Sequence, residues 1–184
     1  MRIIDLEPSN ERLIRQIAAM LIEGFKLTAP TAWPDIDGAV AEVRESLGDD
    51  RLSRVAVDED GAPLGWIGGI RQYNGHAWEI HPLVVRPDLQ GSGIGRALVS
   101  DFEQRLAKRG ADTIFLGTDD EQGMTSLGGI DLYPEVTDHI RNIRNLRRHP
   151  YEFYQKPGFI IVGVMPDANG PGKPDILMAK RVAK

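Results

Sequence analysis

Residues 78–99 read WEIHPLVVRPDLQGSGIGRALV, and this stretch decides the fold. Its first half is an apolar, strand-like run that breaks at Arg86-Pro87, and its second half opens a pattern of apolar residues at helical spacing. The loop QGSGIG, residues 90–95, lies between the two halves. Glycines let successive backbone N–H groups converge on an anion at the positive end of a helix, because no Cβ atom blocks the approach. The order strand, glycine loop, helix therefore predicts a phosphate-binding loop.

Three types of phosphate-binding loop can be distinguished by their sequences, although glycine-rich turns also precede helices for packing reasons alone. A Walker loop needs Gly-Lys-Ser/Thr, whereas Arg96-Ala97 follow the last glycine. A dinucleotide-binding loop has a different glycine spacing and opens a βαβ unit. Asp112 lies near the distance of an acidic ribose ligand, but this strand follows three other predicted strands. The pattern Gln-x-x-Gly-x-Gly at residues 90–95 instead resembles the acyl-CoA pyrophosphate loop of the GCN5-related N-acetyltransferases (GNAT).

Length and composition indicate one domain over residues 1–184, since 41% of the residues are hydrophobic. No apolar run of about 18 residues occurs, and the start of the chain is acidic and polar, so we expect a soluble, cytoplasmic protein without membrane contact. The net charge of −5 disfavours a general nucleic-acid binder and suits a cationic small substrate, although solubility alone also explains it.

Residue types that bind metals or attack substrates covalently are scarce. The chain has no cysteine, which excludes disulfides, a thiol nucleophile and thiolate metal sites. Its four histidines show no metal-ligand spacing, so we expect no metal.

Apolar periodicity predicts the other elements. Strands are predicted at residues 1–6, 52–58, 63–73, 78–85, 113–117, 160–165 and 176–180. Helices are predicted at residues 11–26, in a segment with Ile36, Val40, Val43 and Leu47 turned inward, from the glycine loop to Gly110, and at residues 135–148. Glycines 65, 68 and 69 predict a bulge or a close backbone approach. This order is typical of an α/β (α+β) protein built on a mixed sheet.

A second motif supports the first. Residues 152–159 read EFYQKPGF, which resembles the Phe-Tyr-x-Lys-x-Gly-Phe helix end of the same superfamily. Taken alone, Tyr154 is more typical of a half-buried packing tyrosine. Together, the two motifs imply the GNAT fold, a central, mostly antiparallel mixed sheet of about six to seven strands flanked by helices.

Four further features resemble the aminoglycoside 6'-N-acetyltransferases. They are Trp33-Pro34, the strand WEIHPLVV, the acidic insert GTDDEQGMTSLG and Lys173-Pro174-Asp175. The resemblance implies acetyl-CoA as cosubstrate and direct attack by a 6'-amine, without a covalent enzyme intermediate. It places the pantetheine arm and the pyrophosphate on Leu83, Val84, Val85, Gln90, Gly91, Ser92, Gly93, Ile94, Gly95 and Arg96.

Acceptor chemistry requires a group that removes a proton. An alkylammonium has a pKa of about 10.4, so only roughly one molecule in a thousand is nucleophilic at neutral pH. Glu79 and His81 lie two residues apart on a predicted strand, hence on one face, and either could take the proton directly or through water. Their alternative interpretations are a surface carboxylate and a structural histidine before a proline. By resemblance, Tyr154 lies near the sulfur and protonates the departing thiolate.

A polycationic acceptor explains the acidic loops. We expect Trp33 as a stacking wall and carboxylates that attract the ammonium groups, although a solvated loop is the alternative for each of them. These candidates are Glu79, Asp119, Asp120, Glu121 and Asp175.

Other functions stay open at this point. The same fold could acetylate a polyamine or a protein amine, or act as a non-catalytic acyl-CoA-binding domain. The arginines of residues 141–148 predict a solvated or subunit-facing helix, and a nucleic-acid contact is the weakest alternative. The resemblance also implies a homodimer.

Overall fold

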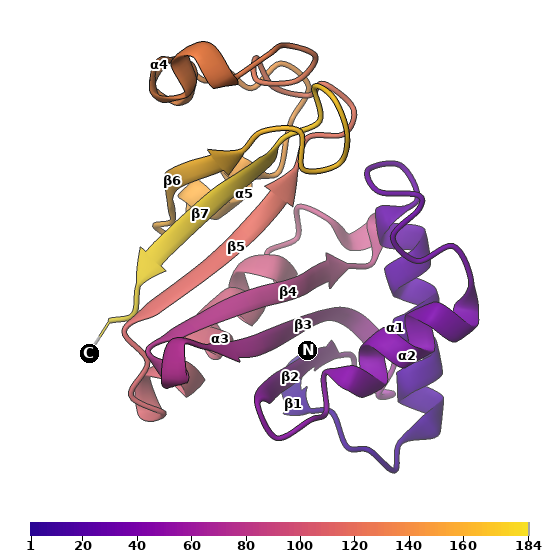
Figure 1. Cartoon of the computed structure of the whole chain (residues 1–184). Helices are drawn as coiled ribbons and strands as arrows, with labels where there is room; N and C mark the ends of the chain where they lie inside the picture. Colours follow the sequence, from indigo (N-terminus) through magenta and orange to yellow (C-terminus); the bar gives the residue numbers. More distant parts are fainter. Residues whose placement is uncertain (184) are drawn as a thin grey trace. The chain divides into compact units, whose positions relative to one another are not determined.

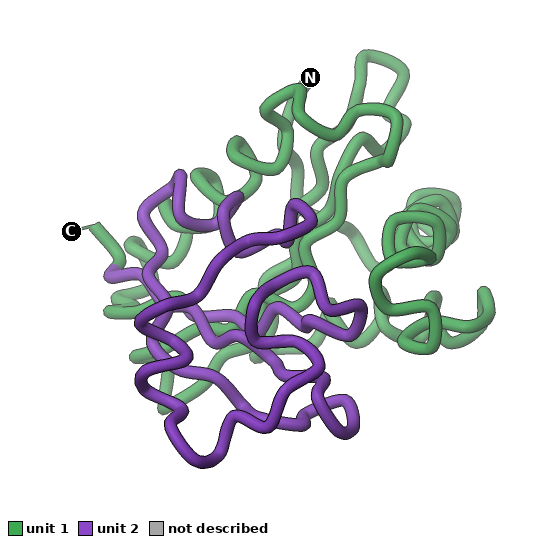
Figure 2. Tube along the Cα trace, turned by 90° about the horizontal axis from the view of Figure 1, so that it is seen from above, with its two compact units in different colours: residues 1–114, 182–184 green, residues 115–181 purple. Residues whose placement is uncertain are grey.

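The computed structural model of the chain describes residues 1–183 (Figure 1). They form two compact units, shown in different colours in Figure 2. Unit 1 comprises residues 1–114 and the chain end from Val182, and unit 2 comprises residues 115–181. The single domain expected from the chain length remains a prediction.

Unit 1 is a four-stranded antiparallel sheet with three helices. Its strands are adjacent in chain order, β1-β2-β3-β4. The elements are β1 (Arg2–Asp5), α1 (Glu11–Phe25), α2 (Ile36–Glu45), β2 (Arg51–Val57), β3 (Pro63–Gln72), the short 3₁₀ helices η1 (Tyr73–Gly75) and η2 (Pro87–Leu89), β4 (Ala77–Val85) and α3 (Ile94–Lys108).

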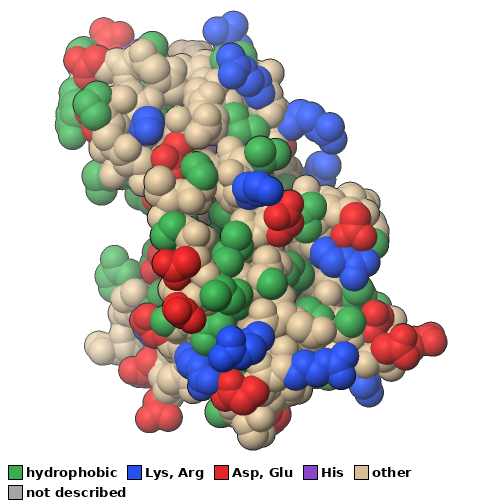
Figure 3. Space-filling view, turned by 90° about the vertical axis from the view of Figure 1, so that its right-hand side faces the viewer, with side chains coloured by type: hydrophobic (Ala, Val, Ile, Leu, Met, Phe, Trp, Pro, Cys, Tyr) green, Lys and Arg blue, Asp and Glu red, His purple; other side chains and the backbone are tan. Residues whose placement is uncertain are grey.

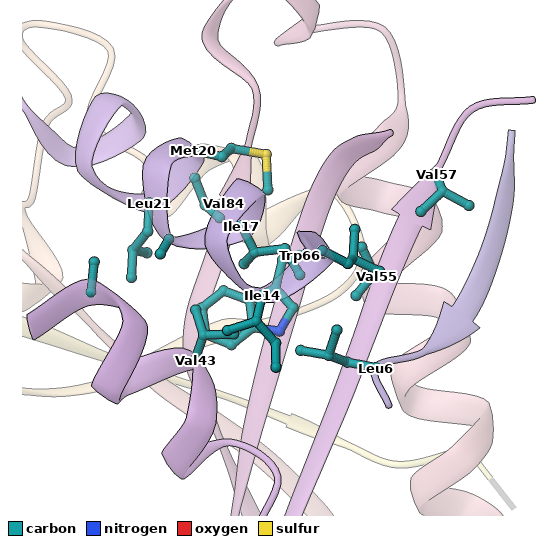
Figure 4. Packing of buried hydrophobic residues seen from close by; sticks show 13 residues of the cluster. Leu6, Ile14, Ile17, Met20, Leu21, Val43, Val55, Val57, Trp66 and Val84 are labelled. Atoms are coloured by element: carbon teal, nitrogen blue, oxygen red, sulfur yellow. The ribbon is translucent and has the colours of Figure 1, made fainter. Parts of the chain in front are cut away.

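The apolar face of α1 covers the core of unit 1. Asn10 caps this helix, since its side chain accepts a hydrogen bond from the Leu13 N–H at 3.1 Å. Trp66, Ile14 and Val43 meet in the cluster of Figure 4. In the second helix Val43 points inward as predicted, whereas Ile36 is exposed because it occupies the first position after the cap, Asp35.

Strand β2 is buried along nearly its whole length. Leu52 through Val57 are all buried, because elements pack on both faces of the sheet. Val55 and Val57 belong to the core cluster with α1, and Arg54 points to α3, where it binds Asp101. Two-sided coverage therefore overrides the pattern of a half-solvated strand.

Helix α3 has the predicted inward face, since Ile94, Leu98, Phe102 and Leu106 are all buried. It lies directly on β3, and a Cβ atom at Gly69 would collide with the Phe102 ring. A register shift between Ile67 and Gly69 marks a bulge where β3 pairs with β4. The predicted bulge and close approach at the β3 glycines are both confirmed.

Unit 1 contains a buried cation, the side chain of Arg54. Arg54 is 1% exposed, and its guanidinium donates to Asp101 at 2.6 and 3.2 Å and contacts Asp5 at 2.5 Å. Burial disfavours the charge, but the hydrogen bonds that Arg54 donates to Asp101 and Asp5 outweigh it, so the pKa of Arg54 is raised. This group connects β1, β2 and α3 through charge.

Unit 2 has the strand order β5-β7-β6, with β6 and β7 antiparallel. Its elements are β5 (Thr113–Asp119), which begins at the unit boundary, the 3₁₀ helix η3 (Tyr133–Glu135), α4 (Val136–Arg141), α5 (Tyr151–Gln155), β6 (Ile160–Met165) and β7 (Asp175–Arg181). The described residues thus hold seven strands, which confirms the predicted α/β fold with six to seven mostly antiparallel strands.

The helix predicted at residues 135–148 is wrong in length. Helix α4 ends at Arg141, and the Asn142 side chain then donates to the Asp138 carbonyl. After the helix, Asn145 forms a β-bridge to Thr125. Pairing with residues 124–126 therefore replaces the helix that the spacing of isoleucines and arginines predicts.

Candidate active site

Strand β4 presents one accessible and one buried face. Trp78, Ile80 and Val84 are buried, whereas Glu79, Leu83 and Val85 are partly exposed and His81 is exposed. The predicted placement of Glu79 and His81 on one face is confirmed. Val84 contributes its side chain to the core, so only its main chain is open to a ligand.

A β-bulge interrupts β4 beside His81. Ile67 pairs with Leu83 and Gly69 pairs with Ile80, so His81 and Pro82 together face Gly68. A Cβ atom at Gly68 would collide with the His81 carbonyl oxygen. Glycine at position 68 therefore permits the bulge, which locally breaks the regular ladder next to a candidate catalytic residue.

His81 has two neighbours in unit 1. Its ring centroid lies 6.4 Å from that of Trp33, and its Nε2 lies 3.7 Å from Oε1 of Glu42 on α2. Trp33 in turn packs edge-on against Phe25, with centroids 4.9 Å apart. A cavity of about 210 Å³ is lined by Ile22, Glu23, Phe25, Lys26, Ala29, Pro30, Trp33 and Pro34. The structure thus brings Trp33 and His81 together and adds Glu42, which no sequence motif marks.

The glycine loop has the geometry of an anion cradle. Gly91 and Gly93 have φ angles of +82° and +94°, and a Cβ atom at either would meet no atom within 4 Å. The first hydrogen bond of α3 runs from the Ala97 N–H to the Gly93 carbonyl. The preceding N–H groups, those of residues 94–96, therefore have no partner inside the helix and point toward its positive end.

The exposed faces of the loop suit a solvent-borne ligand. Gln90, Gly91, Ser92, Gly93 and Arg96 are exposed, whereas Ile94 and Gly95 are buried beneath them. Just before the loop, Arg86 donates to Asp88 at 2.7 and 3.1 Å, and this hydrogen bonding lowers the pKa of the Asp88 carboxyl. The residues present fit a phosphate held by main-chain groups.

Unit 2 brings together the acidic insert and the start of β7. Asp119 ends β5, and its Oδ1 accepts a hydrogen bond from the Asn169 side chain at 2.5 Å. Glu121 lies 3.9 Å from Nζ of Lys173. The Asp175 carboxylate packs against Gly117 of β5, where a side chain would collide with it. Asp119, Glu121 and Asp175 therefore belong to one region of unit 2.

Asp120 is placed differently from its acidic neighbours. It is 1% exposed, and its carboxylate accepts hydrogen bonds from the Met124 N–H at 2.6 Å, the Thr125 N–H at 2.8 Å and the Thr125 hydroxyl at 2.7 Å. Its own N–H donates to the Pro174 carbonyl. The charge of Asp120 thus organises the insert from within.

Tyr154 lies on α5 and is 9% exposed. Its ring packs edge-on against Phe153 and Phe159, with centroids 4.9 and 5.7 Å away. Burial raises the pKa of its hydroxyl well above the ordinary value of 10.0. The group therefore holds its proton at neutral pH.

His149 is a buried residue that no motif singled out. Its Nε2 lies 3.0 Å from the Asp119 carbonyl oxygen, and its Nδ1 accepts the Tyr151 N–H at 3.2 Å. These partners require a neutral ring with its proton on Nε2, and burial lowers the pKa of His149 in agreement. The only feature of the sequence that could have drawn attention to His149 is its position directly before Pro150, at the start of α5.

No group of three or more histidine and acidic side chains could hold a metal ion among residues 1–183. None of the helices within that range has the length and apolar character needed to cross a bilayer.

The geometry can now be compared with known proteins. The sequence profile described as acetyltransferase (GNAT) family matches residues 18–128, which include β4, the glycine loop and α3. The chain belongs to the GNAT family. The predicted membership of the GNAT superfamily is confirmed, and the matched range includes the glycine loop but not residues 152–159.

Three solved structures resemble this GNAT chain over all of its length. An aminoglycoside 6'-N-acetyltransferase complexed with coenzyme A is 42% identical, with a TM-score of 0.91 and 98% of its own chain covered. The enzyme of that name from Enterococcus faecium is 41% identical, with a TM-score of 0.88 and 98% coverage. Aminoglycoside 6'-acetyltransferase type Ii is 36% identical, with a TM-score of 0.74 and 99% coverage. A comparison with curated protein sequences gives no significant match.

Proposed function

We propose that this GNAT chain transfers the acetyl group of acetyl-CoA to the 6'-amino group of aminoglycoside antibiotics and thereby confers resistance. One observation carries the proposal: three structures similar over the full chain at 36–42% identity all bear the name of this activity. The proposed class is aminoglycoside 6'-N-acetyltransferase, acting in the cytoplasm, where acetyl-CoA is available.

Acetyl-CoA supplies the acyl group as an activated thioester. The main-chain N–H groups around Gly91, Gly93 and Gly95 bind its pyrophosphate, and Gln90, Ser92, Ile94 and Arg96 complete the loop. The left-handed backbone at Gly91 and Gly93 and the uncapped start of α3 support this assignment. Main-chain groups of Leu83, Val84 and Val85 hold the pantetheine arm, and the Leu83 N–H stabilises negative charge that develops on the acyl oxygen.

The acceptor amine loses its proton to the accessible face of β4. Glu79 or His81 takes this proton directly or through water, and the amine then uses its electron pair to attack the thioester. Tyr154 holds its hydroxyl proton at neutral pH and donates it to the departing thiolate. Direct transfer needs no covalent enzyme intermediate, which agrees with the absence of cysteine from the chain.

The polycationic acceptor binds by charge and stacking. Trp33 provides an aromatic wall, while Asp119, Glu121, Asp175 and Glu79 attract ammonium groups. Asp120 adds to the same negative field, but its oxygens are committed to Met124 and Thr125, so we assign it the shaping of the insert.

A thiol-release assay tests this function. Acetyl-CoA is supplied with matched aminoglycosides that carry either an amine or a hydroxyl at the 6' carbon, and release is expected with the amine alone. Turnover of spermidine or peptide amines, with none of 6'-amino sugars, would assign the chain to another amine.

The variant Glu79→Gln tests whether the chain is an enzyme or a non-catalytic acyl-CoA-binding domain. Losing the carboxylate that fixes the ammonium or accepts its proton lowers kcat by about a hundredfold or more, while coenzyme A affinity stays at the wild-type value. A non-catalytic acyl-CoA-binding domain would show no turnover to lose. Nucleic-acid binding has no comparable support, since the net charge is −5 and the face in Figure 3 carries acidic as well as basic side chains.

We further propose a homodimer that uses β6. Ile160 and Val162 are exposed apolar residues on this strand, at 65% and 58% exposure. Covering them with a second copy would remove apolar surface from water. Light scattering should give a dimer mass for the wild type, and Val162→Lys should give the monomer mass.

A further inference from the structure

A carboxylate on α2 lies near Nε2 of His81. Oε1 of Glu42 lies 3.7 Å from Nε2 of His81, and the two side chains are 23% and 46% exposed. The distance slightly exceeds a hydrogen bond and lies within the range of a charge pair. Proton-transfer contacts commonly tighten when the substrate binds.

The position of Glu42 follows from the burial of its helix. Ala39 and Val43 are the fully buried residues of α2. Position 42 is adjacent to 43 and three residues after 39, so it borders the buried face of the helix. The carboxylate is therefore held against the sheet, and the Trp33 ring lies 6.4 Å from the imidazole.

We propose that Glu42 is a positioning residue for His81, an inference that rests on the proposed function. The Glu42 carboxylate accepts the Nε2–H of the neutral imidazole, which leaves Nδ1 as the nitrogen with a free electron pair. An N–H bond of the substrate ammonium breaks, its proton passes to Nδ1 and its electron pair stays on the amine nitrogen. The resulting imidazolium is stabilised by the Glu42 charge until it returns the proton to solvent.

Activity of single and double variants tests this assignment. Glu42→Gln removes the charge with little change in shape and should lower kcat by about tenfold, with KM for acetyl-CoA unchanged. Glu42→Asp keeps the charge and should recover part of the loss. In the His81→Ala background, Glu42→Gln should have no further effect, because positioning requires the imidazole.

A matched control lies three residues further along the same helix. Glu45 pairs with Arg51 at 2.9 Å and is 67% exposed, so Glu45→Gln should leave kcat at the wild-type value. Equal losses in Glu42→Gln with and without His81 would overturn the positioning role, since they would assign Glu42 to the fold or to direct substrate contact.

The imidazole itself provides a readout that does not depend on turnover. Nitrogen-detected NMR of His81 should report the Nε2–H tautomer in the wild type and a mixture of tautomers in Glu42→Gln. An Nδ1–H tautomer in the wild type, or identical spectra in both proteins, would overturn the inference. If no 6'-amino sugar is acetylated, the proposed function fails, while these spectra still decide the Glu42 to His81 contact.

Discussion

Unit 1 and unit 2 bury different kinds of side chain. In unit 1, the helix α1 and the sheet enclose a large apolar cluster around Trp66, and Arg54 is its one fully buried charged residue among those described. In unit 2, a carboxylate, Asp120, and an imidazole, His149, are each 1% exposed and hydrogen-bonded to the main chain.

The difference follows from the amount of regular structure in each unit. Apolar faces of long helices and strands pack without polar groups, because their main chain is hydrogen-bonded internally. Unit 2 contains the irregular segment from residue 120 to residue 150, where main-chain N–H groups need other partners. Asp120 and Asn145 provide them, so buried polar side chains replace regular structure there.

Removing the single buried cation of unit 1 should have the largest effect on stability. Arg54→Ala leaves the Asp101 carboxylate partly buried without its partner, and we expect a loss of about 3–5 kcal/mol in the free energy of unfolding. Denaturant titration measures this loss. Arg44→Ala breaks the exposed pair with Glu11 and should cost at most about 1 kcal/mol.

Removing the buried carboxylate of unit 2 should have the next largest effect. Asp120→Ala leaves the Met124 and Thr125 donors without an acceptor and should cost about 3 kcal/mol, at 1–3 kcal/mol for each buried unsatisfied group. Hydrogen exchange should accelerate in residues 120–126 before it does in the core of unit 1.

Asp119→Ala is the matched control for Asp120. Its side chain is exposed and bonds only to Asn169 among the described residues, so stability should change little while KM for the aminoglycoside rises. Equal destabilisation by both variants would mean that Asp120 has no special role in holding the insert.

The structure of unit 1 follows from its sequence more closely than the structure of unit 2 does. Helix α3 and its inward residues follow from apolar spacing, and β4 places Glu79 and His81 on one face because strands alternate. In unit 2, residues 135–148 have helical spacing, yet the helix ends at Arg141 because the Asn145 region pairs with Thr125. Long-range main-chain pairing leaves no periodic trace in the sequence.

Residues of the candidate site could be predicted where they belong to a sequence motif. The glycine loop, Glu79 and Tyr154 lie in recognisable patterns, whereas Glu42 resembles any exposed helical glutamate. Its contact with His81 depends on how α2 lies against β4, which the order of residues does not reveal. In the same way, nothing in the letters TDDE separates the buried Asp120 from the exposed Asp119.

Acidification should weaken unit 2 more than unit 1 through His149. Burial lowers its pKa in the folded chain, so the unfolded chain binds the proton more readily. The stability contributed by the neutral ring is present above the unfolded pKa of about 6.5 and falls as the pH drops below it, by at most about 1.4 kcal/mol per pH unit.

Hydrogen exchange at pH 7.5 and pH 5.5 measures this dependence. Residues 145–155 should lose protection at the lower pH in the wild type, and His149→Gln should reduce the difference between the two pH values. His76→Gln changes a histidine that is 74% exposed in unit 1 and should leave the difference intact. A pH effect of equal size in His149→Gln would assign it to other groups.

The smallest change in stability is expected for Gly93→Ala in the glycine loop. Comparing this variant with Gly61→Ala distinguishes backbone strain from the loss of a ligand contact. Gly93→Ala places a Cβ atom in open space at a φ of +94°, so the cost is conformational, about 1–2 kcal/mol. Gly61, in the turn between β2 and β3, is the control, because it lies outside the proposed anion site. Its φ is +82° and the space around it is also open, so alanine should cause the same strain there. Both variants should lose similar stability, but only Gly93→Ala should weaken coenzyme A binding, as measured by calorimetry. If Gly61→Ala weakens it equally, strain anywhere in unit 1 is sufficient, and the loop has no special fit for a phosphate.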